Sequence, residues 1–219
     1  MHYKAVVLDF DGTIFRLFCN YDLNKTKQEL ISMLNEYEVE FYVQNDAFEV
    51  FGKIFDSELE KRVKSDLLKK ANEIIKCAEI EALDTGVLID GFTEFLEWID
   101  SNNYSIAIAT NNSEECVREF FSRYYNRTDC IVVGRDCQRP DLMKPHTYML
   151  DKMCELLKLS CNEICFVGDS LRDYDCAYEF GCRFVGMAPT SRKKEKLQKS
   201  IGESIIVENY IELISKGIV

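Results

Sequence analysis

The chain has 219 residues, of which 47% are hydrophobic and 30% are charged, and its formal net charge is −11 at pH 7. This length suits one large domain or a domain with an insert, and the composition is that of an ordinary soluble globular protein. The acidic balance argues against a broad surface for a phosphate backbone, so we expect no nucleic-acid partner. No apolar run approaches transmembrane length, so we expect no membrane partner.

Ten cysteines are scattered through the sequence without a Cys-x-x-Cys pair, and only two histidines accompany them. No zinc site of familiar spacing can be assembled from these residues. Residues 1–4 lead straight into the first predicted strand, so we expect no signal peptide. Reduced cysteines that act as small hydrophobic side chains fit a reducing compartment, and we predict a cytoplasmic protein.

The first predicted strand, Ala5–Leu8, stops abruptly at Asp9-Phe10-Asp11-Gly12-Thr13. In an open α/β sheet, a polar loop at the carboxyl end of a buried strand is a candidate ligand site. Two carboxylates this close repel each other and are normally stabilised by a bound cation or by protonation of one of them. The alternative is a solvated pair of turn carboxylates, with Gly12 supplying the turn.

The block from Phe15 to Asp84 shows no evident strand, and its apolar residues recur at helical spacing. A helical block between two α/β segments predicts an inserted subdomain. We therefore assign residues 1–14 and 85–219 to an α/β core domain and residues 15–84 to a helical domain. The predicted helices in this block are Asn24–Glu40, Asp46–Phe55 (interrupted at Gly52) and Ser57–Ile80.

Strand and helix alternate regularly in the rest of the chain. Short, fully apolar strands between helices predict an α/β fold in which a Rossmann-like parallel sheet has helices on both faces. We interpret the basic run Arg192-Lys193-Lys194 as a solvated helix face rather than a binding patch. The predicted strands are Tyr104–Ala109, Cys130–Val133, Ile164–Val167, Arg183–Val185 and Ser204–Val207, and the predicted helices are Gly91–Asn102, Ser113–Tyr124, Pro145–Leu159, Arg172–Phe180 and Ser191–Ser200.

Polar side chains follow several of the predicted strands. Because the carboxyl ends of parallel strands meet at one edge of a sheet, we expect these side chains to lie together. Carboxylates suit a hard divalent cation such as Mg²⁺, and hydroxyl, amide and ammonium groups can donate to phosphate oxygens. The residues are Asp9 and Asp11, Thr110 and Asn111, Lys144, and Asp169 with Asp173.

Lys144 also lies just ahead of the predicted helix start at Pro145, where free backbone N–H groups favour an anion. The group as a whole predicts a site for a metal and a phosphate. Each residue has a simpler explanation when taken singly: Thr110 as a strand-end hydroxyl, Asn111 as a turn residue, Lys144 as a surface lysine and Asp173 as a first-turn helix acid.

The motifs and their order along the chain resemble those of the haloacid dehalogenase (HAD) superfamily of hydrolases. Residues 9–13 match the family's D-x-D-G-T motif, Thr110 its strand that ends in Ser or Thr, Lys144 its motif lysine and Gly168–Asp173 its G-D-S-x-x-D motif. The resemblance covers nearly the whole chain. The helical block is similar to the cap domain of the phosphoglycolate phosphatase-like branch, which is inserted between the first two motifs.

The resemblance implies a Mg²⁺-dependent phosphatase that acts through a phosphoaspartyl intermediate. Asp9 is then the nucleophile, and Asp11 protonates the leaving alcohol and later takes a proton from the attacking water. Thr110, Asn111 and Lys144 bind the phosphoryl oxygens. The implied partner is a small phosphorylated metabolite, and the implied assembly is a monomer or a homodimer.

The same resemblance implies a Mg²⁺ site formed by Asp9, the backbone carbonyl of Asp11, and Asp169, with Asp173 orienting the metal's ligands. It further implies that residues 15–84 act as a mobile cap that sets substrate choice. The family commonly has Asp-Ser shortly after the first motif, where this chain has Arg16-Leu17. Arg16 is thus a candidate contact for an anionic substrate, and the alternative is a solvated or cap-packing arginine.

The sequence leaves four other functions to consider. A phosphomutase typically has a histidine early in the cap, and this insert has none. A dehalogenase or phosphonatase lacks the second aspartate of the first motif, so Asp11 argues against both. A binding or regulatory protein on the same scaffold is the remaining alternative, and the intact acidic and basic positions argue against it.

Overall fold

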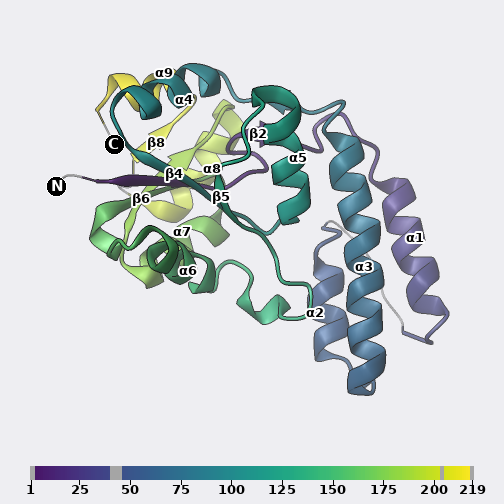
Figure 1. Cartoon of the computed structure of the whole chain (residues 1–219). Helices are drawn as coiled ribbons and strands as arrows, with labels where there is room; N and C mark the ends of the chain where they lie inside the picture. Colours follow the sequence, from purple (N-terminus) through teal and green to yellow (C-terminus); the bar gives the residue numbers. More distant parts are fainter. Residues whose placement is uncertain (1–2, 40–45, 203–204, 218–219) are drawn as a thin grey trace.

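The computed structural model describes residues 3–39, 46–202 and 205–217. Its centre is a parallel sheet of six strands in the order β5-β4-β1-β6-β7-β8 (Figure 1). β1 (Ala5–Leu8) is buried along its whole length between β4 and β6, as its run of aliphatic residues requires. The predicted α/β fold is confirmed. The other five strands are β4 (Ser105–Ala109), β5 (Ile131–Val133), β6 (Ile164–Gly168), β7 (Arg183–Met187) and β8 (Ile205–Val207).

Helices cover both faces of this sheet, because successive side chains of a strand point to opposite faces. Val6 and Leu8 of β1 pack toward the face covered by α4, α5 and α9, whereas Ala5 and Val7 pack toward the face covered by α6, α7 and α8. The bounds are α4 (Phe92–Ser101), α5 (Glu114–Tyr125), α9 (Tyr210–Ser215), α6 (Tyr148–Leu157), α7 (Leu171–Phe180) and α8 (Ser191–Ile201), with short 3-10 turns η1 (Pro140–Leu142) and η2 (Cys161–Glu163).

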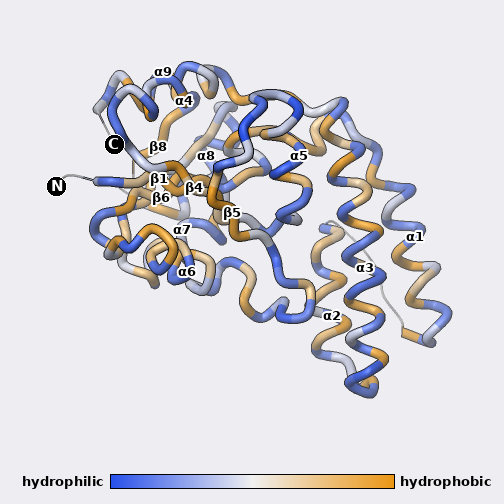
Figure 2. Tube along the Cα trace, viewed as in Figure 1, coloured by the Kyte–Doolittle hydropathy of each residue, from blue (hydrophilic) through white to orange (hydrophobic). Residues whose placement is uncertain are grey.

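Three further helices form a separate group beside the sheet, at the end away from both chain termini (Figure 1). α3 (Lys61–Ala82) packs between α1 (Asn24–Asn35) and α2 (Glu49–Asp56), and their apolar side chains form a core of their own. Figure 2 shows hydrophobic and hydrophilic segments alternating along each of these helices, as expected for helices with one buried face. We call residues 24–82 the helical insert.

A two-stranded antiparallel ribbon lies where the insert joins the sheet, formed by β2 (Phe15–Arg16) and β3 (Val87–Leu88). The expectation of no strand between residues 15 and 84 is therefore wrong at Phe15–Arg16. A strand of two residues is too short to produce an alternating pattern in the sequence, so periodicity could not detect it.

Several predicted boundaries in the insert also shift. The first helix ends at Asn35 rather than Glu40, which itself lies outside the described residues. The second runs through Gly52 without interruption, since a single glycine weakens a helix without ending it. The third begins at Lys61 rather than Ser57.

The ten cysteines are all free, and several of them are buried in the core as the small hydrophobic side chains expected from the sequence. Burial raises the pKa of the Cys165 thiol to about 12, so this side chain stays neutral. None of the helices in the described part of the chain combines the length and the apolar composition that a membrane crossing requires.

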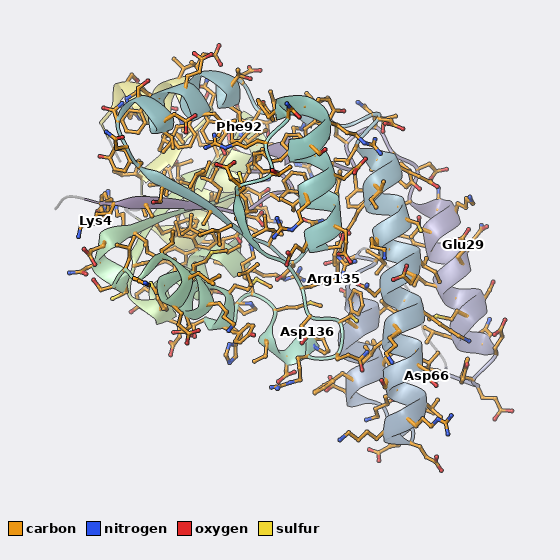
Figure 3. The ribbon with its side chains drawn as sticks, in the orientation of Figure 1. Lys4, Glu29, Asp66, Phe92, Arg135 and Asp136 are labelled. Atoms are coloured by element: carbon orange, nitrogen blue, oxygen red, sulfur yellow. The ribbon has the colours of Figure 1, made fainter. Side chains whose placement is uncertain are left out.

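Helix α9 attaches the end of the chain to the loop after β1. Tyr210, on α9, is fully buried against Phe92 and Phe95 of α4, and its hydroxyl donates to the Thr13 carbonyl oxygen at 3.0 Å. Figure 3 shows Phe92 among the side chains on this face of the sheet.

We expect Tyr210→Phe to lower the free energy of unfolding by about 1 to 2 kcal/mol, because it leaves the Thr13 carbonyl without this donor. Urea unfolding followed by circular dichroism measures the change. Tyr178→Phe is the matched control, because the Tyr178 side chain is 75% exposed and should contribute nothing measurable. Equal stability of both variants would contradict the expectation.

Candidate active site

The carboxyl ends of β1, β4 and β6 meet at the edge of the sheet that faces the helical insert. A cavity of about 290 Å³ lies there, and residues from both the sheet and the insert line it. In open α/β sheets this edge, outside the strand ends, is where ligands bind. Six of the seven predicted site residues line the cavity: Asp9, Asp11, Asn111, Lys144, Asp169 and Asp173.

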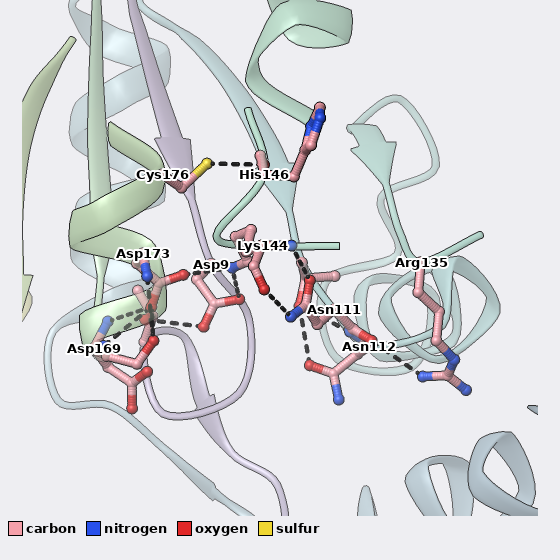
Figure 4. Close-up of polar contacts among 12 residues, drawn as sticks. Asp9, Asn111, Asn112, Arg135, Lys144, His146, Asp169, Asp173 and Cys176 are labelled. Atoms are coloured by element: carbon pink, nitrogen blue, oxygen red, sulfur yellow. Dashed lines mark hydrogen bonds and ion pairs between the residues drawn. The ribbon is translucent and has the colours of Figure 1, made fainter. Parts of the chain in front are cut away.

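Lys144 lies at the centre of the site (Figure 4). Its Nζ donates to Asp9 Oδ1 at 2.7 Å and to Asp173 Oδ1 at 2.5 Å, and all three side chains are buried. Burial lowers the pKa of Lys144, but Asp173 and Asp9 outweigh this effect and raise it to about 12. Burial raises the pKa of Asp9, and Lys144 acts against that shift. The lysine therefore stays charged and draws two carboxylates together.

Hydrogen bonds at the start of α7 fix the Asp173 carboxylate. Its Oδ2 accepts hydrogen bonds from Asp169 N at 3.2 Å, Ser170 N at 3.0 Å and Ser170 Oγ at 2.6 Å, and this closes a capping box at the start of α7. A Cβ on Gly168 would lie 2.4 Å from Asp173 Cβ, so only glycine fits there. The first turn of α7 thus fixes Asp173 relative to β6.

Asn111 holds the backbone of Lys144. Its Oδ1 accepts from Lys144 N at 2.9 Å, and its Nδ2 donates to Lys144 O at 3.1 Å. The predicted helix start at Pro145 is wrong, because α6 begins at Tyr148 after a turn, so Lys144 does not lie at the N-terminus of a helix. An anion here would be bound by the side chain of Lys144 and not by helix N–H groups.

Thr110 lies behind the cavity wall. It is fully buried, its hydroxyl donates to Asn112 Oδ1 at 3.0 Å, and it accepts from Asn112 N at 3.2 Å. It does not line the cavity, unlike the neighbouring Asn111. In this structure Thr110 shapes the loop after β4.

Asp11 lies beside Asp9 and is partly exposed to the cavity. Its Oδ1 accepts from Leu17 N at 2.8 Å, and burial raises the pKa of the carboxyl group to about 7. A carboxyl group with this pKa can donate and accept a proton near neutral pH. Gly12, in the loop after β1, has φ +85°, and an added Cβ would collide with the Asp169 carboxylate.

The carboxylates could hold a metal ion. One oxygen each from Asp9, Asp169 and Asp173 can be chosen so that all three lie within 4.8 Å of one another. Three hard oxygen donors fit Mg²⁺. Lys193 on α8 contacts the Asp169 carboxylate and adds a positive charge at this position. The interpretation of residues 192–194 as a solvated face is therefore wrong for Lys193, which its helix carries into the site.

Arg16, the candidate contact for an anionic substrate, lies on β2 and is exposed. It does not line the cavity. The structure therefore does not bring Arg16 together with the other predicted site residues.

The haloacid dehalogenase-like hydrolase family matches residues 6–187 of the sequence, which include every one of these strand-end motifs. The chain belongs to this family. The match spans both the sheet and the helical insert, so the motif residues and the inserted helices are described by one family. No curated protein matches the sequence.

Solved structures share the fold over nearly the whole chain. A protein described as a predicted phosphatase from Clostridium acetobutylicum has a TM-score of 0.68 at 15% identity, covering 100% of this chain and 99% of that one. A protein described as a predicted phosphoglycolate phosphatase from Haemophilus somnus 129PT has a TM-score of 0.66 at 18% identity, covering 99% of each chain. A HAD-superfamily hydrolase of subfamily IA from Geobacter sulfurreducens has a TM-score of 0.56 at 21% identity, covering 97% and 95%.

A buried ion pair that the sequence did not reveal joins the insert to the site. Glu79 on α3 accepts from Arg135 Nη1 at 2.5 Å, from Asn112 Nδ2 at 3.1 Å and from Ser113 Oγ at 2.5 Å. Both charged side chains are 0% exposed. Arg135 Nη1 also donates to the Asn111 carbonyl oxygen at 3.3 Å, so the pair reaches the residue that holds Lys144.

Arg135 makes further contacts with the insert. Its Nε donates to Asn72 Oδ1 at 2.8 Å, and its guanidinium lies 5.2 Å from the ring of Phe51 and 5.5 Å from that of Phe48. In Figure 3 it lies between the sheet and the helices α2 and α3. One loop residue after β5 therefore contacts two helices of the insert.

We expect Glu79→Gln to lower the free energy of unfolding by about 3 kcal/mol or more, because it leaves the buried Arg135 guanidinium without a charged partner. Urea unfolding measures the change. Glu73→Gln is the control on the same helix, since the Glu73 side chain is 62% exposed and pairs with the neighbouring Lys76. It should change stability by under about 1 kcal/mol. Similar small losses in both variants would contradict a buried, charge-dependent link.

Proposed function

We propose that the protein is a Mg²⁺-dependent phosphatase that hydrolyses the phosphate monoester of a small metabolite through a phosphoaspartyl intermediate. The observation that supports this most is the placement of Asp9 on the cavity floor, with Lys144 at 2.7 Å on one side and Asp11 beside it. Phosphatase descriptions of proteins with the same fold, such as those from C. acetobutylicum and H. somnus, agree with the proposal.

In the first half-reaction, a carboxylate oxygen of Asp9 attacks phosphorus. A bond forms between that oxygen and phosphorus, and the bond from phosphorus to the leaving oxygen breaks. Asp11 donates its proton to the leaving oxygen, and a pKa of about 7 lets it carry that proton near neutral pH. The products are a phosphorylated Asp9 and the free alcohol.

In the second half-reaction, Asp11 accepts a proton from a water molecule that attacks the phosphorylated Asp9. The bond between Asp9 and phosphorus breaks, inorganic phosphate forms and the carboxylate is restored. Lys144 and Asn111, which line the cavity, are the proposed donors to the phosphoryl oxygens in both steps. Thr110 supports them from behind the wall by shaping the loop that carries Asn111.

The proposed Mg²⁺ ligands are Asp9, the backbone carbonyl of Asp11, and Asp169, with Asp173 orienting the surrounding ligands. The charge and oxygen chemistry of the three grouped carboxylates support this choice. When bound, the ion neutralises the repulsion between the nucleophile and the phosphate.

We assign residues 15–84 as a cap over this site and residues 1–14 and 85–219 as the catalytic core. The cavity lining supports the assignment, because the insert contributes one of its walls. We place the reaction in the cytoplasm, on the ground that all ten cysteines are free. The enzyme would act there as a monomer or a homodimer.

Asp9→Asn should abolish turnover while the protein stays folded, because an amide is nearly isosteric with a carboxylate but a poor nucleophile. We expect the rate of p-nitrophenyl phosphate hydrolysis to fall by a factor on the order of 10³ or more. Circular dichroism and urea unfolding check the fold. Asp175→Asn, two residues beyond Asp173 on α7 and exposed, is the control and should leave the rate unchanged. Near wild-type turnover by purified Asp9→Asn would remove the covalent mechanism.

Hydrolysis should stop when EDTA removes the divalent cation and should return on addition of Mg²⁺. Ca²⁺ should support it poorly, because it accepts more ligands in a looser geometry. Isothermal titration calorimetry gives a second readout, in which Asp169→Asn should weaken Mg²⁺ binding. Full activity in EDTA after dialysis would rule out a role for the metal.

A further inference from the structure

The wall of the cavity opposite the catalytic aspartates belongs to the region before and within the helical insert, and it is mainly apolar. Phe18 and Leu23 precede α1, Ala47 and Phe48 precede α2, and Ile75 and Ala78 lie on α3. Among the described residues of this region, Thr26 and Asp46 are the polar ones in the lining. In the described part of the chain, the insert side of the cavity therefore supplies no basic side chain. Residues 40–45 contain no lysine, arginine or histidine in the sequence either.

The charge of the cavity is already strongly negative. Its lining includes five carboxylates and two basic side chains, Lys144 and Arg172. Lys144 forms ion pairs with Asp9 and Asp173. Arg172 pairs with Asp46 at 3.2 Å, and its side chain is 54% exposed at the rim. Lys193 contacts the Asp169 carboxylate and does not line the cavity. A bound Mg²⁺ would be matched by the phosphate dianion, so a further anionic group on the substrate would find no unpaired cation among the described residues that line the cavity.

We propose, on the basis of the phosphatase function above, that the leaving alcohol of the substrate is uncharged and largely apolar. The phosphoryl group lies against Asp9 and Lys144, and the body of the alcohol lies against the apolar wall, where Phe18 and Phe48 offer two aromatic rings. Burying a hydrocarbon group on this wall favours binding, whereas a carboxylate there must lose its hydration without gaining a partner. Phosphoglycolate, whose leaving group carries a carboxylate, is thus a poor substrate.

The test compares three phosphate monoesters on the full-length protein with Mg²⁺, by release of inorganic phosphate. Ethyl phosphate and phosphoglycolate are a matched pair, because they differ by a methyl group in place of a carboxylate. Benzyl phosphate extends the apolar part. We expect kcat/KM to rise from phosphoglycolate to ethyl phosphate to benzyl phosphate, with each step at least about tenfold. Phosphoglycolate as the best of the three would overturn the proposal.

Substitutions in the apolar wall of the cavity test whether this wall causes the preference among the esters. Leu23→Lys places a cation beside the leaving group at a half-buried position that precedes α1, and it should raise kcat/KM for phosphoglycolate relative to ethyl phosphate by about tenfold. Leu23→Met is the uncharged, apolar control of similar volume and should leave that ratio unchanged. Arg172→Gln should also leave it unchanged. A selective loss of phosphoglycolate turnover in Arg172→Gln would show that the rim arginine binds a carboxylate, and would overturn the proposal.

Binding separates failure of this inference from failure of the proposed function. Asp9→Asn with Mg²⁺ should bind benzyl phosphate at least about tenfold more tightly than phosphoglycolate in calorimetry. If the wild-type protein hydrolyses none of the esters and this binding preference remains, the phosphatase proposal fails and the preference for an apolar group stands. If hydrolysis occurs but phosphoglycolate binds as tightly as benzyl phosphate, the inference fails and the phosphatase proposal stands.

Discussion

The buried contact of Lys144 with Asp9 and Asp173 is the interaction on which the site depends. Three ionisable side chains lie out of water, and the charge of Lys144 offsets the burial of two carboxylates that would otherwise repel each other. They come from three places in the sequence, after β1, after β5 and at the start of α7, so the contact requires β5, β4, β1 and β6 to lie side by side in the sheet. The contact of Lys144 with both aspartates connects three loops at one edge of the sheet.

Hydrogen bonds from neighbouring residues hold this group in place. Asn111 fixes the backbone of Lys144 with two hydrogen bonds, and the capping box of α7 fixes Asp173 with three. A group held in this way loses little freedom when a phosphate binds, which is the condition for electrostatic stabilisation of developing charge. Glu79 and Arg135 extend the same arrangement into the insert, because the guanidinium bonds to the carbonyl of Asn111. The position of α3 and the loop that carries Asn111 are thereby physically linked.

The parts of this arrangement that the sequence could predict are those that leave a local pattern. An aliphatic strand that stops at Asp9 and Asp11, or at Gly168 and Asp169, is visible within ten residues, and the parallel sheet follows from the alternation of such strands with helices. The ion pair of Glu79 and Arg135 spans 56 residues, and in the sequence its members resemble any helix glutamate and loop arginine. The sequence predicts Lys193 to be part of a solvated helix face because its contact with Asp169 likewise leaves no local pattern in the sequence.

The predicted start of the helix after Lys144 is wrong because a tertiary contact outweighs a local sequence preference. Pro145 is a favourable first residue for a helix, yet the chain uses the next residues to bring Lys144 to Asn111 before α6 begins at Tyr148. The seventh predicted site residue, Thr110, is adjacent to the cavity, but its hydroxyl is used by the turn to Asn112. Which of several neighbouring polar groups faces a ligand is a property of side-chain partners, and those partners are set by the whole fold.

The sheet and the insert supply different walls of the cavity, and this limits what similarity of fold can say about the substrate. The groups proposed to act on the phosphoryl moiety all come from the strand ends, and the wall that would contact the rest of the substrate comes mainly from the insert. At 15% to 18% identity, related structures keep the sheet and the inserted helices while most side chains differ. A shared backbone thus accounts for the arrangement of the strand ends. The chemistry of the opposite wall depends on side chains of this chain, such as Phe18, Leu23 and Ile75.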